Sequence, residues 1–206
     1  MKEREQRVRG FIADNLGRIQ DRIAESLAKA GRAAGAVTLV AVTKEVGLAE
    51  IETLRDLGVT HFGENRIQTA EPKISAAGEG VVWHMVGNIQ RRKAKDVVRL
   101  FDRVDAVDRI ELADELAARA GGRESALPVL LEVNVSGEPS KHGFVPAELP
   151  SVLERVSGLS ALRVEGLMTM APFYDNAERA RPLFAALVAC RHAWSFAHID
   201  GNVKRL

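Results

Sequence analysis

The sequence predicts an α/β domain in which parallel strands alternate with helices. Three observations carry this prediction: the 206 residues fit one domain, 46% of them are hydrophobic, and short β-branched runs alternate with stretches of helical periodicity. Strands that alternate with helices form right-handed βαβ units. An open doubly wound sheet and a (β/α)8 barrel are both built from such units, and periodicity alone leaves the two open. We expect a single domain over residues 1–206.

The pattern of elements begins with a helical segment at residues 1–35. From about residue 3 to residue 31, apolar residues recur every three or four positions and indicate one stripe on a long helix: Val8, Phe11, Ile12, Leu16, Ile19, Ile23 and Leu27. The run Val37–Thr43 is apolar at nearly every position, which is typical of a strand buried on both faces. We predict five further strands at residues 59–63, 81–86, 103–107, 128–134 and 162–168. We predict the other helices at residues 48–57, 64–76, 109–120, 148–156 and 176–191. A further helix, basic and amphipathic, is predicted after the strand at 81–86 and ends at residue 100.

Charge and cysteine content exclude several classes of protein. With 29 Lys and Arg against 28 Asp and Glu, the formal net charge is +1, and the basic run at residues 91–95 has no interleaved aromatic residue, so we expect no nucleic-acid partner. The single cysteine, Cys190, fits a reducing cytoplasm. The charged N-terminus does not resemble a signal peptide, and no apolar run approaches the roughly 18 residues of a membrane span. We therefore expect a cytoplasmic protein without a membrane partner.

Polar residues stand where the predicted strands end, and ligands of parallel α/β folds bind at that edge. They include Lys44, Asn65, Asn88, Asp105 to Asp108, Asn134 and Thr169, with Met168 and Met170 beside them. The sequence contains no GxGxxG motif and no phosphate-binding P-loop, which favours the barrel over the doubly wound sheet.

Lys44 is the sharpest candidate among these residues. An amine at the end of a buried strand is desolvated, which lowers its pKa and makes it a nucleophile towards an aldehyde. The alternative is a lysine that pairs at the surface. Asn65 and Asn134 either orient a ligand through their amides or cap the next element. His84 is expected to be a hydrogen-bonded core residue, because no other histidine stands at a metal-type spacing.

Five segments together resemble the family of pyridoxal phosphate homeostasis proteins, which in turn resemble the barrel domain of bacterial alanine racemase. The segments are AVTK at 41–44, FGENRIQ at 62–68, WHMVGNIQ at 83–90 with Lys93, VNVSGE at 133–138 through KHGF at 141–144, and GLMTM at 166–170. They run in family order from about residue 8 to residue 190. The resemblance implies a (β/α)8 barrel in which Lys44 forms a Schiff base, an internal aldimine, with pyridoxal 5′-phosphate; Lys93 and Lys141 are the next candidates for that lysine.

The resemblance also implies a role other than turnover. Such proteins are thought to bind, buffer and deliver the cofactor, so we expect no catalytic residue and no metal. The expected cofactor-binding residues are Lys44, Asn65, His84, Asn134 and Met168. The expected partners are pyridoxal phosphate and the apoenzymes that depend on it.

Two enzyme functions are the alternatives. An amino-acid racemase would need a second, β-rich domain and a tyrosine opposite the lysine, whereas the one tyrosine, Tyr174, is predicted in a loop after the sixth strand. A barrel aldolase that uses a Schiff-base lysine without a cofactor would need an acid/base partner near Lys44. We rank both below the binding function.

Residues 192–206 depart from the family pattern. The family's seventh and eighth strands, with a phosphate-binding segment of the type LSMGMSND, cannot be recognised, so about six of eight strands are readable and the last two are missing or replaced. Codons for Ile199 to Leu206 can be chosen so that the next reading frame spells SMGMSND, which suggests a frameshift; a natural chain with an unrelated tail is the alternative. Family members are monomers, but unpaired strand edges would favour self-association here.

Overall fold

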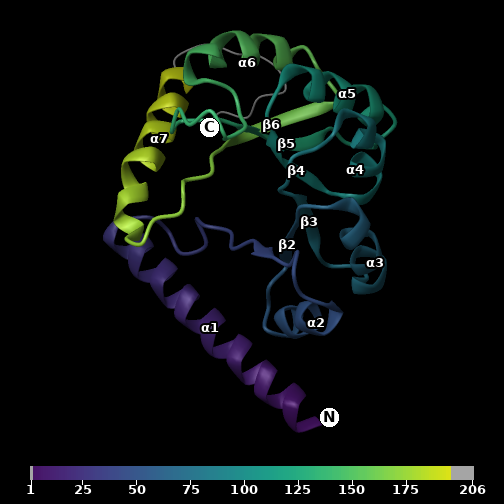
Figure 1. Ribbon diagram of the computed structural model, residues 1–206, viewed down its shortest axis with the longest axis vertical. Coiled ribbons are helices and arrows are strands. Elements are labelled where there is room, and N and C mark those ends of the chain that lie inside the picture. The colour runs from purple at the N-terminus through teal and green to yellow at the C-terminus, as the bar shows by residue number, and fades with distance from the viewer. Residues whose placement is uncertain (1, 196–206) are drawn as a thin grey trace. The chain divides into compact units, whose positions relative to one another are not determined.

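The structure, a computed structural model, describes residues 2–195, in which helices alternate with strands (Figure 1). The strands are β1 (Ala41–Val42), β2 (His61–Glu64), β3 (Val82–Met85), β4 (Arg103–Val107), β5 (Leu127–Glu132) and β6 (Leu162–Met168). The α-helices are α1 (Lys2–Lys29), α2 (Leu48–Asp56), α3 (Ile67–Ala77), α4 (Ala94–Leu100), α5 (Ile110–Ala120), α6 (Leu149–Ser157) and α7 (Arg181–Ser195). Short 3-10 helices are η1 (Arg91–Lys93), η2 (Pro146–Glu148) and η3 (Ala177–Ala180). The predicted alternation is confirmed.

The described strands form one six-stranded sheet in chain order from β1 to β6, and the recorded pairings are parallel. A doubly wound sheet contains a point at which the order of strands reverses. No such point occurs among the described strands, so their order agrees with successive βα units of a barrel. The chain divides into two compact units, Met1–Trp83 and His84–Leu206.

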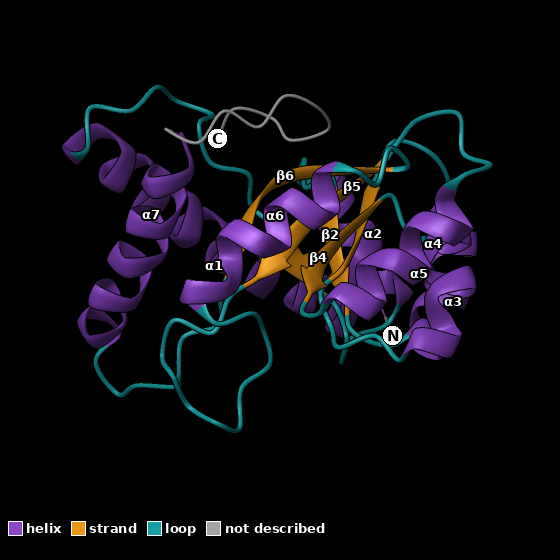
Figure 2. Cartoon of the chain, turned by 90° about the horizontal axis from the view of Figure 1, so that it is seen from above, coloured by secondary structure: helices purple, strands orange, loops and turns teal. Residues whose placement is uncertain are grey.

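In the unit His84–Leu206, helices cover one face of the strands. Helix α5 packs on β4 and β6, and α6 packs on β6; Figure 1 and Figure 2 show both helices on the same side of these strands. Along β5, Leu127, Val129 and Leu131 are fully buried, whereas the intervening Pro128 and Leu130 are half-buried. The side-chain period of two in a strand therefore places the hydrophobic core between β5 and the helices.

In the unit Met1–Trp83, α2 contacts both α1 and α3. An ion pair of 2.8 Å between Arg9 Nη1 and Asp56 Oδ2 joins α1 to α2 at the surface. Helix α2 begins where the Glu50 carboxylate accepts a hydrogen bond of 3.0 Å from the amide of Gly47. This bond satisfies a donor that the first turn of a helix leaves unpaired. Ile51, on the same helix, is fully buried.

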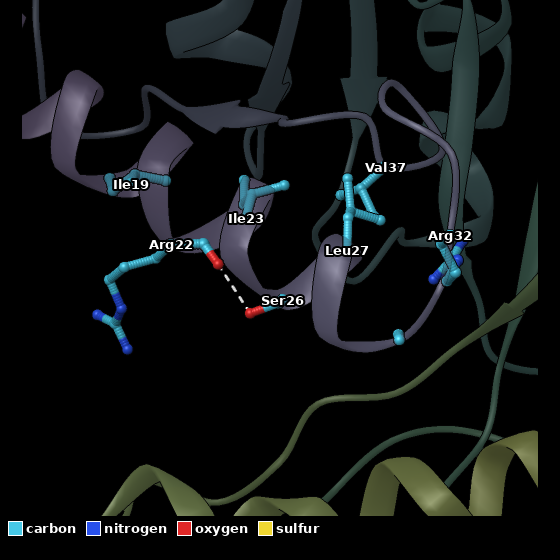
Figure 3. Close-up of a pocket in the computed structure, with 8 residues that line it drawn as sticks. Ile19, Arg22, Ile23, Ser26, Leu27, Arg32 and Val37 are labelled. Atoms are coloured by element: carbon cyan, nitrogen blue, oxygen red, sulfur yellow. Dashed lines mark hydrogen bonds between the residues drawn. The ribbon is translucent and has the colours of Figure 1, made fainter.

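The apolar stripe predicted on the N-terminal helix lies on α1, but it is only partly covered. Leu16 and Leu27 are buried, whereas Phe11 is 67% and Ile19 is 45% exposed. A cavity of about 520 Å³ runs along the C-terminal half of α1 and the loop after it; Figure 3 shows Leu27 and Val37 on its wall. The stripe is therefore fully covered only at Leu16 and Leu27, and its C-terminal half borders an open groove.

The prediction of a first strand buried on both faces over Val37–Thr43 is wrong. The strand comprises Ala41 and Val42 alone, and Val42 is 55% exposed. The physical reason is that β1 is at the edge of the described sheet and pairs with β2 only. An apolar run at an edge has one neighbouring strand, so it is not enclosed as a central strand is.

The C-terminal tail predicted at residues 192–206 overlaps the end of α7 and otherwise lies outside the described residues. The frameshift hypothesis concerns residues 199–206, which also lie outside them. Between residues 2 and 195, no helix has both the length and the apolar character needed to cross a membrane.

Candidate functional site

Lys44 lies in the turn that directly follows β1, at the predicted strand end. Its side chain is exposed, so the expectation that burial desolvates this amine is wrong. The reason is again the edge position of β1. Within residues 2–195, no hydrogen bond or ion pair engages the Lys44 amine. The amine is therefore available to a ligand from solvent.

Asn65 lies at the neighbouring strand end. Val42 of β1 is paired with Gly63 of β2 in parallel, so Lys44 and Asn65 follow the carboxyl ends of two neighbouring strands. Asn65 is half-buried and lies two residues before α3, which begins at Ile67. The structure thus places two of the residues that the sequence singled out after the ends of adjacent parallel strands.

A buried polar network surrounds Thr43, the residue directly before Lys44. Thr43 Oγ1 donates a hydrogen bond of 2.7 Å to Glu64 Oε1. Lys73 Nζ, on α3, donates to the same oxygen at 2.8 Å and to the Thr43 carbonyl at 2.7 Å. Glu64 is fully buried, and its second oxygen, Oε2, has no hydrogen-bond partner among the described residues.

His84 is buried in β3, and its Nδ1 lies 2.6 Å from Asp105 Oδ2 on β4. This geometry agrees with the interpretation of His84 as a hydrogen-bonded core residue. Charged side chains continue across the same sheet: Arg103 Nη1 pairs with Glu165 Oε2 at 2.6 Å, and Arg163 Nε pairs with Glu165 Oε1 at 2.9 Å. The sheet therefore carries a charged ladder from β3 and β4 to β6.

The Asn134 side chain organises its own loop. Its Nδ2 donates to the carbonyls of Glu138 at 2.9 Å and Lys141 at 3.3 Å, and its Oδ1 accepts from Ser136 Oγ and from the amide of Gly137, both at 3.0 Å. Of the two roles considered for this residue, the structure displays the turn-forming one. Contact of Asn134 with a cofactor stays a prediction.

Gly143 closes that loop against the end of β5. Its φ is +114°, and a Cβ atom there would lie 2.8 Å from the Asn134 amide nitrogen and 2.9 Å from the Glu132 carbonyl oxygen. Glycine is required because other residues avoid this φ and would collide with the backbone. The close approach lets Phe144 donate from its amide to the Glu132 carbonyl at 2.8 Å.

A cavity of about 240 Å³ lies where β5 and β6 end, and its wall includes Asn134. Met168 is the last residue of β6 and pairs with Glu132 of β5, a buried carboxyl on the cavity wall. Burial raises the pKa of Glu132, and the Asp108 carboxylate raises it further, whereas His142 opposes the shift. The cavity is thus bounded by a carboxyl that retains its proton more readily than an ordinary glutamate.

Asp108, directly after β4, joins several loops. Its Oδ2 accepts from Asn88 Nδ2 at 2.8 Å and lies 3.7 Å from His142 Nδ1. Its Oδ1 accepts from Arg109 Nη1 at 2.5 Å, and Arg109 also donates to the Ile89 carbonyl at 2.7 Å. These contacts fix the loops that follow β3, β4 and β5. No group of histidine, cysteine and acidic residues in the described part of the chain could hold a metal ion.

Sequence reasoning missed the roles of Lys73, Glu64 and Glu132. Glu132 had a usable signal, because a charged residue inside the apolar run LPVLLEVN needs a reason to be there. Glu64 stood within a recognised segment but was not assigned a role. Lys73 carried no signal, since its partners stand nine and thirty residues away and only the packing of α3 brings them together.

Residues 15–203 match the family described as alanine racemase, N-terminal domain. Among curated proteins, the chain is similar to the Pyridoxal phosphate homeostasis protein of Pseudomonas aeruginosa, with 37% identity over 170 residues, 82% of this chain and 73% of the relative. The protein of the same name from Escherichia coli strain K12 is 33% identical over 197 residues, 92% of this chain and 83% of the relative.

Solved structures agree with these sequence matches. A protein from Bifidobacterium adolescentis superposes with a TM-score of 0.82 at 34% identity and covers 93% of this chain and 81% of its own. PipY of Synechococcus elongatus, solved with PLP bound, has a TM-score of 0.71 at 32% identity and covers 84% and 79% of the two chains. Alanine racemase of Clostridium difficile, at 12% identity and a TM-score of 0.66 over 84% of this chain and 48% of its own, shares the fold.

The predicted fold class is therefore confirmed: the described residues form an α/β fold of the alanine racemase N-terminal type, with a six-stranded parallel sheet consistent with part of a barrel. The five sequence segments that suggested this assignment lie within the matched residues. The chain belongs to the family of pyridoxal phosphate homeostasis proteins.

Proposed function

We propose that this protein binds pyridoxal 5′-phosphate through Lys44 and serves to buffer and deliver that cofactor. The observation that carries the proposal is the exposed Lys44 amine, without a partner in the described residues, in the turn that follows β1. Homologues of more than 30% identity bear the name Pyridoxal phosphate homeostasis protein, and PipY has been solved with PLP bound. Both facts support the same ligand for this chain.

The residues at this strand end fit the aldehyde end of the cofactor. Bound pyridoxal phosphate supplies an aldehyde, which condenses with a primary amine and releases water. Lys44 offers such an amine to solvent, and Asn65 offers an amide donor and acceptor after the end of the neighbouring strand, β2. The buried Thr43, Glu64 and Lys73 anchor the turn that carries the amine. We propose that Lys44 and Asn65 hold the cofactor here; contributions of His84, Asn134 and Met168 stay predictions.

We further propose that the protein does not turn over amino acids. Racemisation needs an acid/base group on the cofactor face opposite the lysine. Tyr174 follows β6 in a loop, where the Arg179 guanidinium stacks 4.7 Å from its ring centre. This contact supports a local structural role for the tyrosine. Conversion of L-alanine to D-alanine that exceeds the rate of free cofactor and depends on Lys44 would contradict the proposal.

The same proposal includes the cytoplasm as the place of action and apoenzymes that need the cofactor as recipients. The single cysteine supports a reducing compartment. We also keep two expectations as proposals, namely that the chain acts as one domain and that exposed strand edges promote self-association. Size-exclusion chromatography over a range of protein concentrations tests the last point.

The experiment is a titration of the purified protein with pyridoxal phosphate, followed by the visible absorbance of the protein-bound cofactor. We expect saturable binding by the wild-type chain and its loss in Lys44→Ala. Lys95→Ala is the matched control, because Lys95 is also exposed but lies on α4. Equal binding by Lys44→Ala and the wild type would contradict the assignment, and unfolding of Lys44→Ala, seen by circular dichroism, would indicate a structural lysine.

A further inference from the structure

Two elements, β2 and α3, make three hydrogen bonds with Thr43, the residue before Lys44. The strand end of β2 supplies two contacts: the Gly63 carbonyl accepts the Thr43 amide at 2.9 Å, and the Glu64 carboxylate accepts the Thr43 hydroxyl at 2.7 Å. Helix α3 supplies the third, because Lys73 Nζ donates to the Thr43 carbonyl at 2.7 Å. The amide, hydroxyl and carbonyl of one residue are therefore all fixed by neighbours.

The Thr43 carbonyl also holds the turn that contains Lys44. The amide of Val46 donates to this carbonyl at 3.2 Å and so closes the turn Thr43 to Val46. Lys73 Nζ and the Val46 amide thus share one acceptor. Any movement of the Thr43 carbonyl would be passed to the turn and to the Lys44 backbone within it.

Stability alone is a poor explanation for this network. The Lys73 side chain is only 13% exposed, and Glu64 is fully buried with Oε2 unpaired. A buried ion pair is costly to desolvate, and well-packed apolar residues in its place are often neutral or stabilising. A buried oxygen without a partner adds a further cost. A network that is expensive and incompletely satisfied indicates a role beyond the free energy of folding.

We propose that Lys73, through its bond to the Thr43 carbonyl, is a positioning residue that sets the place of the Lys44 amine. This inference rests on the proposed function, in which Lys44 reacts with an aldehyde. Lys73 itself stays bound to Glu64 and Thr43 and does not react. Its effect on Lys44 is geometric, because misplacement of a reacting group by about 1 Å can reduce its reactivity up to roughly a hundredfold.

The test separates the charge of Lys73 from its hydrogen bond. Lys73→Met removes both and leaves Glu64 as an unpaired buried charge, so it weakens folding as well. The double variant Glu64→Gln with Lys73→Met removes that charge while the Thr43 carbonyl still lacks its Nζ donor. Lys95→Met is the matched control, an exposed lysine outside the network.

Two measurements are made on each variant alongside urea unfolding. The first is amide hydrogen exchange of Val46 in protein without cofactor, which reports directly on the turn. The second is the affinity of the protein for pyridoxal phosphate. Borohydride reduction and peptide mapping identify Lys44 as the lysine that carries the cofactor. In the double variant we expect wild-type stability, Val46 exchange faster by about tenfold, and cofactor affinity weaker by about ten- to a hundredfold.

Recovery of both Val46 protection and cofactor affinity in the double variant would overturn the proposal, because Lys73 would then only balance the charge of Glu64. Failure of the double variant to fold would overturn it too, since the network would be structural. Reduction that labels Lys73 in the wild type would also contradict a positioning role. A wild-type chain with no label on Lys44 would instead contradict the proposed function itself.

Discussion

At the scale of single residues, the environment of Glu132 predicts how the stability of the fold depends on pH. Burial and the Asp108 carboxylate raise its pKa in the folded chain, so the folded state binds this proton more readily than the unfolded state. Stability from this group is then lost as pH rises through the folded pKa. We expect Glu132→Gln to be more stable than the wild type at pH 7, with the difference shrinking towards about pH 4, where an ordinary glutamate also protonates.

Urea unfolding of both proteins at a series of pH values checks this prediction. Glu115→Gln is the contrasting control: Arg119 and then Arg91 lower the pKa of Glu115, so the substitution should cost stability at pH 7 and lose its effect at low pH. A Glu132→Gln protein that is less stable than the wild type at pH 7 would contradict the account of this carboxyl.

Gly143 makes a second prediction at this scale. Gly143→Ala places a Cβ within 2.8 Å of backbone at a φ of +114°, and we expect a loss of about 1–3 kcal/mol of stability. Gly122→Ala is the matched control, because a Cβ there meets nothing within 4 Å. Thermal unfolding of the two variants measures the difference, and equal stability would mean that the loop end does not need glycine.

At the scale of elements, the buried and the exposed residues of the apolar stripe on α1 should contribute unequally to the stability of the fold. Leu16→Ala removes a buried side chain, and we expect a loss of about 2–5 kcal/mol. Phe11→Ala removes a side chain that is 67% exposed, and the change should stay within about 0.5 kcal/mol. Urea unfolding compares the two. A large loss for Phe11→Ala would show that another surface covers this part of α1.

The elements also show where sequence reasoning succeeds. The strands predicted at residues 103–107 and 162–168 agree with β4 and β6 to the residue, because both are bordered by clear turns and buried on their helix-covered face. The first strand was predicted too long and too buried. The pattern Val37–Thr43 has the residues of a central strand, and only the pairing of strands reveals that β1 lies at an edge.

At the scale of the whole molecule, the alternation of strands and helices predicted the fold class, and five sequence segments predicted the family. The position of Lys44 at a strand end followed from the same pattern. The hydrogen-bond network around Thr43 could not be predicted from that pattern, because Glu64 and Lys73 meet Thr43 only through tertiary packing. A sequence can indicate which residue faces a ligand more readily than which residues hold it in place.

We propose above that Lys44 is the residue that binds pyridoxal phosphate. The most direct test is borohydride reduction of the protein incubated with the cofactor, followed by proteolysis and mass spectrometry of the labelled peptides. We expect one dominant label on Lys44, lost in Lys44→Ala without transfer to another lysine. Dominant label on Lys93, Lys141 or any other lysine, or equal label across the exposed lysines, would contradict it.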